Sequence, residues 1–394
     1  MQKKNRVLTI DVMRGLTLFL MLFVNDLYGT EVPEWLTHRP ANFDGMGLAD
    51  WVFPGFLFMV GLAVPFAIQS RLNKGDSKLK LLGHVILRTI SLLIIGVLML
   101  NVSRLNPELT GLNKNLWAIL VYLSIFLIWN KYANLKSKFV ALLKGIGVIG
   151  LITLVLVFKA GSADEILWIE TGWWGILGLI GWGYLVTAIT FLVVKENLVK
   201  TGIIWILFIV GNILSQLGLL SFLNFLNPVF GVILGGSIPS IVLAGLFFSL
   251  ILRKISGENL IKFLVLGIAL GVLVLGFGYV LRHWFIISKI KGTPSWALIC
   301  SGISILIFMF LYIVIDIFGV KKWTAVLKPA GQNSLTTYLA PDILYFTIWL
   351  SGSSMLFYKQ SEHTMIVIFG SIVWALLMIG LAAILSKIGI RLKL

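Results

Sequence analysis

Twelve apolar runs are the feature that most constrains what this chain can fold into. A helix needs about 20 apolar residues to cross the hydrocarbon layer of a bilayer, and most of the runs approach that length. The runs are continuous rather than alternating, which argues against a membrane barrel and predicts an all-α, polytopic transmembrane helix bundle. The run at 116–129 is short, so eleven crossings with a re-entrant segment are the alternative. The runs lie at 7–28, 48–70, 81–101, 116–129, 139–158, 172–194, 201–220, 232–252, 263–281, 297–318, 332–350 and 364–385.

The charges give the predicted bundle an orientation. Only 12% of the residues are charged, against about 25% in soluble proteins, yet the net charge is +16. Of the 32 Lys and Arg residues, 22 fall on the side of the N-terminus, 8 fall on the opposite side, and Arg88 and Lys144 fall inside runs. Positive residues concentrate in cytoplasmic loops, so both termini are predicted to be cytoplasmic, in what we expect is a bacterial cytoplasmic membrane. The basic charge is thus topological, and we expect membrane lipids rather than nucleic acid as partners.

The loops between the runs are too short to fold alone, which predicts a single membrane domain over residues 1–394. No internal repeat is evident, which disfavours the inverted-repeat transporters. There is one cysteine, Cys300, and the four histidines have no metal-ligand spacing. We therefore expect no metal site.

Asp11 and Arg14 form the first polar pair within the apolar pattern. Their i, i+3 spacing places them on one helix face, at the predicted cytoplasmic end of the first crossing. They are either a structural ion pair at the interface or part of an anion pocket in which Arg14 faces a phosphate-bearing ligand.

A second polar group lies in and beside the predicted external loop between the first two crossings. Asn25 ends the first helix, His38 lies in the loop, and Asp50 opens the second helix. A loop histidine is often a solvated bystander, and Asp50 could be only a helix cap. Imidazole also takes and returns a proton near neutral pH, as general base catalysis requires.

Asp342 is the third candidate, because it lies near the middle of a predicted crossing and directly follows Pro341. A carboxylate at that depth is costly unless it is paired or protonated. Asp342 is therefore either a site residue or a structural hydrogen-bond partner.

Several motifs carry a resemblance to a known family. They are R-V-L-T-I-D-V-M-R-G (6–15), F-V-N (23–25), His38, G-L-A-D-W-V-F-P-G-F-L-F-M-V-G (47–61), T-P-S-W-A-L (293–298) and P-A-G-Q-N-S-L-T-T-Y (329–338). Together they resemble the heparan-alpha-glucosaminide N-acetyltransferase family and its bacterial relatives. Two departures are L-V-Y at 120–122, where the family has L-Q-R, and an apparent addition at about 172–220 to a ten-helix core.

The resemblance implies a transmembrane acetyltransferase that takes acetyl-CoA from the cytoplasm and acetylates an amino sugar on the opposite face. It implies that His38 is the active-site histidine, as general base or acetyl carrier. It also implies catalytic positions at Asn25 and Asp342. In the mechanism that we predict, Asp50 is catalytic as well, and Asp50 and Asp342 orient the histidine or close the polar cavity. Acetyl-CoA would contact the residues Arg14, Asp11, Asn333 and Ser334. The family resemblance also favours a homodimer.

The predicted function is therefore transfer of an acetyl group from cytoplasmic acetyl-CoA to an amino sugar or related glycan at the external face. The alternative is a multi-pass transporter or flippase of an envelope glycan or lipid precursor. An assembly factor, in which the polar residues only cap helices, is a third possibility.

Overall fold

The structure, a computed structural model, describes residues 7–27, 32–133, 135–353, 356–361 and 363–394, and these residues are almost entirely helical. Five short helical turns are η1 (Val102–Arg104), η2 (Ser221–Leu226), η3 (Ile313–Ile317), η4 (Lys322–Ala325) and η5 (Phe357–Gln360). Strands β1 (Ala160–Gly161) and β2 (Ile166–Leu167) form an antiparallel hairpin in which Ala160 pairs with Leu167. The α-helices are α1 (Leu8–Asp26), α2 (Leu48–Leu72), α3 (Lys78–Asn101), α4 (Pro107–Thr110), α5 (Lys114–Trp129), α6 (Ser137–Val157), α7 (Gly175–Val194), α8 (Leu198–Gln216), α9 (Asn227–Leu234), α10 (Ser237–Ile255), α11 (Leu260–Leu281), α12 (Pro294–Tyr312), α13 (Lys328–Gln332), α14 (Ser334–Leu350) and α15 (Thr364–Lys387).

Every one of the twelve predicted runs coincides with a helix, which confirms the all-α polytopic bundle. In the described part of the chain, ten helices are long and apolar enough to cross a membrane. The remaining two predicted crossings, α5 and α14, are shorter, with 16 and 17 residues. The run predicted at 232–252 is divided, because Gly236 adopts a left-handed conformation (φ 71°) that ends one helical segment and starts α10.

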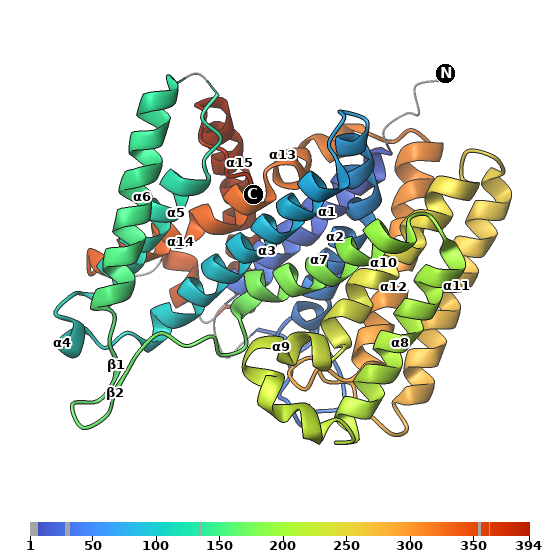
Figure 1. Cartoon of the computed structure of the whole chain (residues 1–394), viewed down its shortest axis with the longest axis horizontal. Coiled ribbons are helices and arrows are strands. Elements are labelled where there is room, and N and C mark those ends of the chain that lie inside the picture. Colours follow the sequence, from blue (N-terminus) through green and yellow to red (C-terminus); the bar gives the residue numbers. More distant parts are fainter. Residues whose placement is uncertain (1–6, 28–31, 134, 354–355, 362) are drawn as a thin grey trace.

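The helices are arranged around a central group formed by α1, α2, α10 and α12 (Figure 1). The most extensive pairings join α11 to α12, α2 to α10, α3 to α7 and α5 to α6. Helices α5, α6, α14 and α15 lie together at one end of the view, and α8 and α11 lie at the other. Most of α2 is buried, whereas α6, α8 and α11 expose most of their apolar surface. That exposed surface is what a lipid environment would cover.

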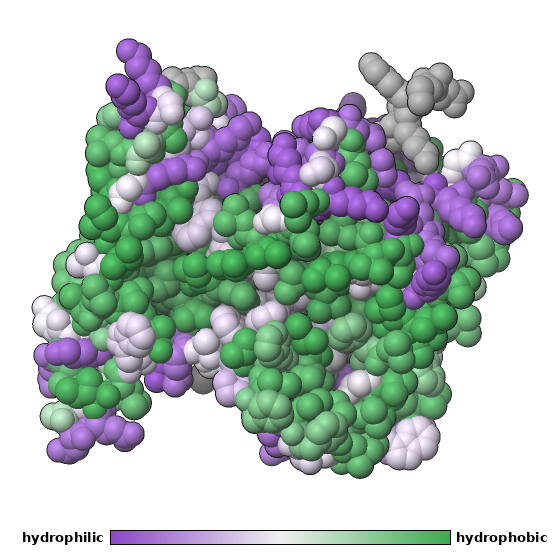
Figure 2. Space-filling model, viewed as in Figure 1, coloured by the Kyte–Doolittle hydropathy of each residue, from purple (hydrophilic) through white to green (hydrophobic). Residues whose placement is uncertain are grey.

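The surface has the pattern expected of a membrane protein. Figure 2 shows a broad apolar band, with hydrophilic residues along the upper edge and a smaller number at the lower edge. The upper edge is the side on which α1 begins and α15 ends (Figure 1). The unequal edges agree with the counted charge bias, while the assignment of the upper edge to the cytoplasm stays a prediction.

The crossing of α1 and α13 depends on a pair of glycines. A Cβ atom added to Gly15 would lie 2.3 Å from the carbonyl oxygen of Leu327, and one added to Gly331 would lie 2.2 Å from that of Asp11. Only glycine permits so close an approach of the two backbones. The contact brings the start of α14 against the first turns of α1, where Arg14 lies.

The segment predicted as an addition, at about 172–220, corresponds to α7 and α8. Helix α7 packs against α3, α2 and α10, so it is integrated into the bundle, whereas α8 packs mainly against α10 at the periphery. The ten-helix core and the single-domain organisation stay predictions.

Candidate active site

His38 and Asp50 are in direct contact. Nδ1 of His38 lies 2.7 Å from Oδ1 of Asp50, and the Asp50 side chain is buried while half of the His38 side chain is exposed. The second oxygen of Asp50 accepts the backbone N–H groups of Arg39 (3.0 Å) and Gly47 (3.1 Å). Because both carboxylate oxygens act as acceptors, we assign the proton to Nδ1, which leaves Nε2 as the free basic nitrogen.

Hydrogen bonds from Gly47, at the start of α2, and from Trp296 of α12 hold Asp50 in place. The bond from the Gly47 N–H closes a capping box at the start of α2. The indole N–H of Trp296, on α12, donates to the Asp50 carbonyl oxygen at 3.1 Å. The Gly47 N–H therefore fixes the carboxylate that orients His38, and Trp296 of α12 fixes the Asp50 backbone. We call this end of the molecule the His38 face.

Lys289 is a third member of this group, and it was not predicted from the sequence. Its Nζ lies 3.2 Å from Nδ1 of His38, 3.4 Å from Nε2 and 3.4 Å from the carbonyl oxygen of Ala49. Burial lowers the pKa of the Lys289 ammonium, while the nearby Asp50 carboxylate raises it. Lys289 lies in a short loop between two crossings, so no periodic pattern marked it.

The loop that carries Lys289 is tied to the loop that carries His38. The Asp44 carboxylate accepts the backbone N–H of Ile287 (2.8 Å) and the guanidinium of Arg282 (2.9 Å). Ser288 donates its hydroxyl to the carbonyl oxygen of Ala41 at 2.8 Å. These bonds keep Lys289 opposite His38.

Asn25, the predicted partner of His38, is exposed at the end of α1, and no hydrogen bond between the two is found among the described residues. Its neighbour Asp26 is buried and forms an ion pair with Lys359 at 2.8 Å. Tyr345 and Tyr358 also donate their hydroxyls to Asp26. Burial and the Asp26 carboxylate raise the pKa of Tyr358.

Asp342 is not beside His38. It lies on α14 and accepts a hydrogen bond from Tyr122 of α5. The structure thus brings His38 and Asp50 together and places Asp342 in a separate contact between two helices. Tyr122 belongs to the L-V-Y segment in which the sequence departs from the family pattern.

At the other end of α1, the predicted donor-site residues meet. Arg14 contacts Asp11 at 3.0 Å and donates Nε to the Gly331 carbonyl oxygen at 2.6 Å. The Ser334 hydroxyl donates to the same carbonyl oxygen at 3.3 Å. Asn333 is buried, and its Oδ1 has no hydrogen-bond partner among the described residues. We call this end the Arg14 face.

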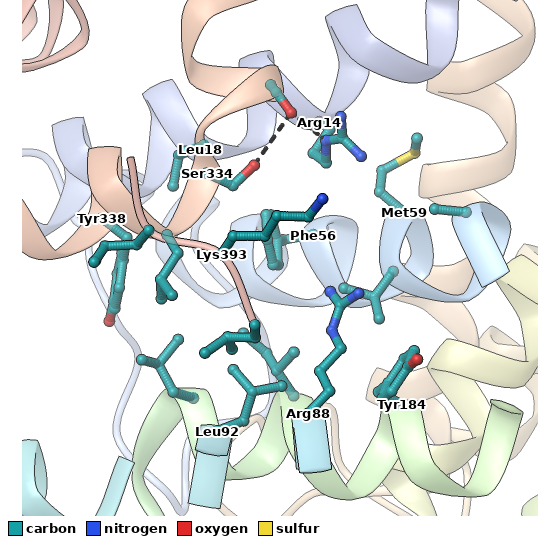
Figure 3. Close-up of a pocket in the computed structure, with 18 of the residues that line it drawn as sticks. Arg14, Leu18, Phe56, Met59, Arg88, Leu92, Tyr184, Ser334, Tyr338 and Lys393 are labelled. Carbon is teal, nitrogen blue, oxygen red and sulfur yellow. Dashed lines mark hydrogen bonds between the residues drawn. The ribbon is translucent and has the colours of Figure 1, made fainter. Parts of the chain in front are cut away.

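A cavity of about 280 Å³ opens beside Arg14. Among its described lining residues are three cations, Arg14, Arg88 and Lys393, and no acidic residue. Figure 3 shows the charged ends of Arg88 and Lys393 reaching into the space beside Phe56. The other lining side chains are mostly apolar. A cavity of this kind suits an anionic group attached to an uncharged chain.

Two of the three cations owe their position to tertiary contacts. The guanidinium of Arg88, on α3, lies 4.6 Å from the centre of the Tyr184 ring, and its buried Nε has no hydrogen-bond partner among the described residues. The backbone N–H of Lys393 donates to the carbonyl oxygen of Trp129 at 2.9 Å. Burial and nearby cations, Lys131 first among them, lower the pKa of Lys393. Neither Arg88 nor Lys393 was predicted from the sequence as a site residue.

The cavity reaches toward the His38 face. Met21 and Phe56 line it. Met21 lies four residues before Asn25 on α1, and Phe56 lies six residues after Asp50 on α2, which are separations of about 6 and 9 Å along a helix axis. The cavity therefore runs along α1 and α2 from Arg14 toward the end of these helices at which the His–Asp pair lies.

Comparison with known proteins identifies a family that matches this chain. The family described as "Domain of unknown function (DUF5009)" matches residues 6–221. The chain is also similar to heparan-alpha-glucosaminide N-acetyltransferase from Mus musculus, with 41% identity over 97 residues, and from Homo sapiens, with 38% identity over 96 residues. These matches cover 25% and 24% of this chain, and the chain covers 14% of the length of each relative. The chain is thus related to these acetyltransferases, and the relation covers about a quarter of it.

Proposed function

We propose that this chain, which belongs to the DUF5009 family, is a transmembrane acetyltransferase. It takes the acetyl group from acetyl-CoA bound on the Arg14 face and gives it to an acceptor on the His38 face. One observation carries the proposal: a cavity with cationic side chains runs along α1 and α2 from Arg14 toward the end of these helices that holds the His–Asp pair. The relation to named acetyltransferases supports the reaction type.

Acetyl-CoA would bind through its phosphates and its pantetheine arm. Arg14, Arg88 and Lys393 offer charge-assisted hydrogen bonds to phosphate oxygens. The cavity, at about 280 Å³, is slightly smaller than the usual range for ligand sites, about 300–1,000 Å³. It therefore suits the narrow pantetheine arm, while the nucleotide would stay at the mouth of the cavity. Asn333 lies between the cavity residues Gln332 and Ser334 in the sequence, and its Oδ1, which has no hydrogen-bond partner among the described residues, would accept a hydrogen bond from a nucleotide donor.

The chemistry would take place at Nε2 of His38. With Nδ1 donating to Asp50, Nε2 can accept the proton of an attacking acceptor nitrogen, or attack the thioester itself. Asn25 has an exposed amide on the same face and would donate a hydrogen bond to the reacting groups. The name of the relatives supports an amino sugar as acceptor class.

The compartments follow from the charge bias. With the Arg14 face cytoplasmic, acetyl-CoA binds from the cytoplasm and the acceptor binds outside, in a bacterial cytoplasmic membrane. A homodimer is part of the same proposal.

The test is acetyl transfer by the purified protein in lipid nanodiscs. Radiolabelled acetyl-CoA is supplied with glucosamine, and labelled product and released CoA are measured for wild type, His38→Ala and His283→Ala. His283 is an exposed histidine on the same face and serves as the matched control. We expect His38→Ala to lower the rate by about 10²–10⁴-fold and His283→Ala to leave it unchanged.

Equal rates for wild type and His38→Ala would contradict the catalytic assignment. If wild type bound no acetyl-CoA, the transporter or flippase alternative would be favoured. The observation that favours this alternative is Asp342, a carboxylate in the middle of α14 directly after Pro341.

A further inference from the structure

The position of the Lys289 ammonium relative to the His38 ring is unusual. It is nearly equidistant from the two ring nitrogens, at 3.2 and 3.4 Å. A point in the ring plane at both distances would overlap Cε1, so the ammonium lies over the ring face. The Lys289 ammonium also cannot donate a hydrogen bond to Nδ1 of His38, because Nδ1 carries the proton that is donated to Asp50.

We propose that Lys289 is a further catalytic residue of this site, as the donor to the oxyanion that forms on the thioester carbonyl. This assignment rests on the proposed acetyl transfer. Lys289 lies outside the motifs quoted above and outside the residues 6–221 that match the family.

The geometry leaves the ammonium available for that role. A lysine ammonium has three N–H donors, and the Ala49 carbonyl oxygen takes one of them. Among the described residues, no carboxylate lies within ion-pair distance of Lys289. An acceptor nitrogen that donates its proton to Nε2 in the ring plane brings the thioester carbonyl beside the ring, where the carbonyl oxygen can turn toward the ring face that Lys289 covers. The ties between the two loops hold the ammonium there before substrate arrives.

The step balances without another reactant. The acceptor nitrogen bonds to the carbonyl carbon and passes its proton to Nε2 of His38. The carbonyl electron pair moves onto oxygen, where Lys289 donates a hydrogen bond. When the oxyanion collapses, the C–S bond breaks and the CoA thiolate takes the proton from the imidazolium. The products are the acetylated acceptor and CoA.

The kinetic test compares Lys289→Met, Lys289→Arg and Lys291→Met. Lys291 is an exposed lysine two residues away in the same loop, so its variant is the matched control. For Lys289→Met we expect kcat to fall by about 10²–10³-fold, with both KM values nearly unchanged. Lys289→Arg should recover part of the loss, because its charge and donors remain. A rise in the KM for the acceptor with an unchanged kcat would overturn the assignment and make Lys289 an acceptor anchor.

A second measurement does not depend on acetyl-CoA. Diethyl pyrocarbonate acylates histidine through a tetrahedral oxyanion, so its rate at His38 reports the same donor. We expect mass spectrometry to show labelling of His38 about tenfold or more slower in Lys289→Met than in wild type or Lys291→Met. Equal labelling rates would overturn the assignment. If labelling slows in the variant but wild type transfers no acetyl group, the proposed function fails and the donor role of Lys289 is retained.

Discussion

The imidazole of His38 and the carboxylate of Asp50 lie 2.7 Å apart, and the carboxylate is almost fully buried while the imidazole is half exposed. A buried, fixed acceptor thus sets the tautomer of a half-exposed ring and leaves its other nitrogen, Nε2, without the proton. The same division of roles between a carboxylate and a histidine occurs in hydrolase triads.

Asp50→Asn should therefore reverse the tautomer. The amide oxygen would face the N–H groups of Arg39 and Gly47, and the amide NH₂ would donate to Nδ1. The proton then moves to Nε2, which can no longer act as a base. We expect the rate of acetyl transfer to fall by about 10³–10⁴-fold. Glu34→Gln, a change at an exposed carboxylate, is the control. A rate within a few-fold of wild type in Asp50→Asn would contradict this role.

Arg88→Met should weaken the binding of CoA. The guanidinium reaches into the cavity, and its buried Nε has no hydrogen-bond partner in the part of the chain that the structure describes, so a bound phosphate would complete its hydrogen bonds. Loss of one charge-assisted bond costs about 1.5–3 kcal/mol, which corresponds to a Kd about 10–100-fold higher. Isothermal titration with CoA measures this, and Lys144→Met on the exposed face of α6 is the matched control. Equal Kd values for wild type and Arg88→Met would rule out Arg88 as a ligand residue.

The affinity for CoA should also depend on Lys393 at alkaline pH. Burial and neighbouring cations lower its pKa from the ordinary 10.5. Its charge, and the attraction for phosphate, is present below the lowered pKa and is lost as the pH rises through it. We expect the Kd of wild type to rise at a lower pH than an ordinary lysine would require, when titrated from pH 7 upward. Lys393→Arg should keep the affinity constant over that range, and a parallel rise in both proteins would contradict the prediction.

Tyr122→Phe tests whether Asp342 is structural or catalytic. Tyr122 is the hydrogen-bond donor found for the Asp342 side chain among the described residues, and removing it leaves a half-buried carboxyl group without that donor. We expect the protein to lose about 1–3 kcal/mol of stability, seen as a lower Tm in detergent. Acetyl transfer at 25 °C should stay within a few-fold of wild type, because the hydrogen bond found for Asp342 among the described residues joins it to Tyr122 and not to His38 or Asp50. A large loss of kcat with an unchanged Tm would instead place Asp342 in the chemistry.

Two pairs of residues that the sequence placed close together are in contact in the structure. Asp11 and Arg14 are on one helix face, and Asp50 lies one loop away from His38, so local spacing was enough to associate them. Lys289 and Lys393 were missed because each reaches its site through a contact between segments far apart in the chain. A lysine in a short loop or near a chain end has no pattern that distinguishes it from a solvated one.

The apolar runs by themselves determined the helices, because a segment of hydrocarbon length must satisfy its own backbone hydrogen bonds wherever it lies in the membrane. That requirement is local, so all twelve predicted runs are helical. Only the tertiary structure decided which polar groups meet. The Lys289–His38 contact joins residues separated by 251 positions, and Asp342 is paired with Tyr122 rather than His38. Such pairings depend on how helices cross and how loops fold over their ends, and those are properties of the packed bundle rather than of any single run.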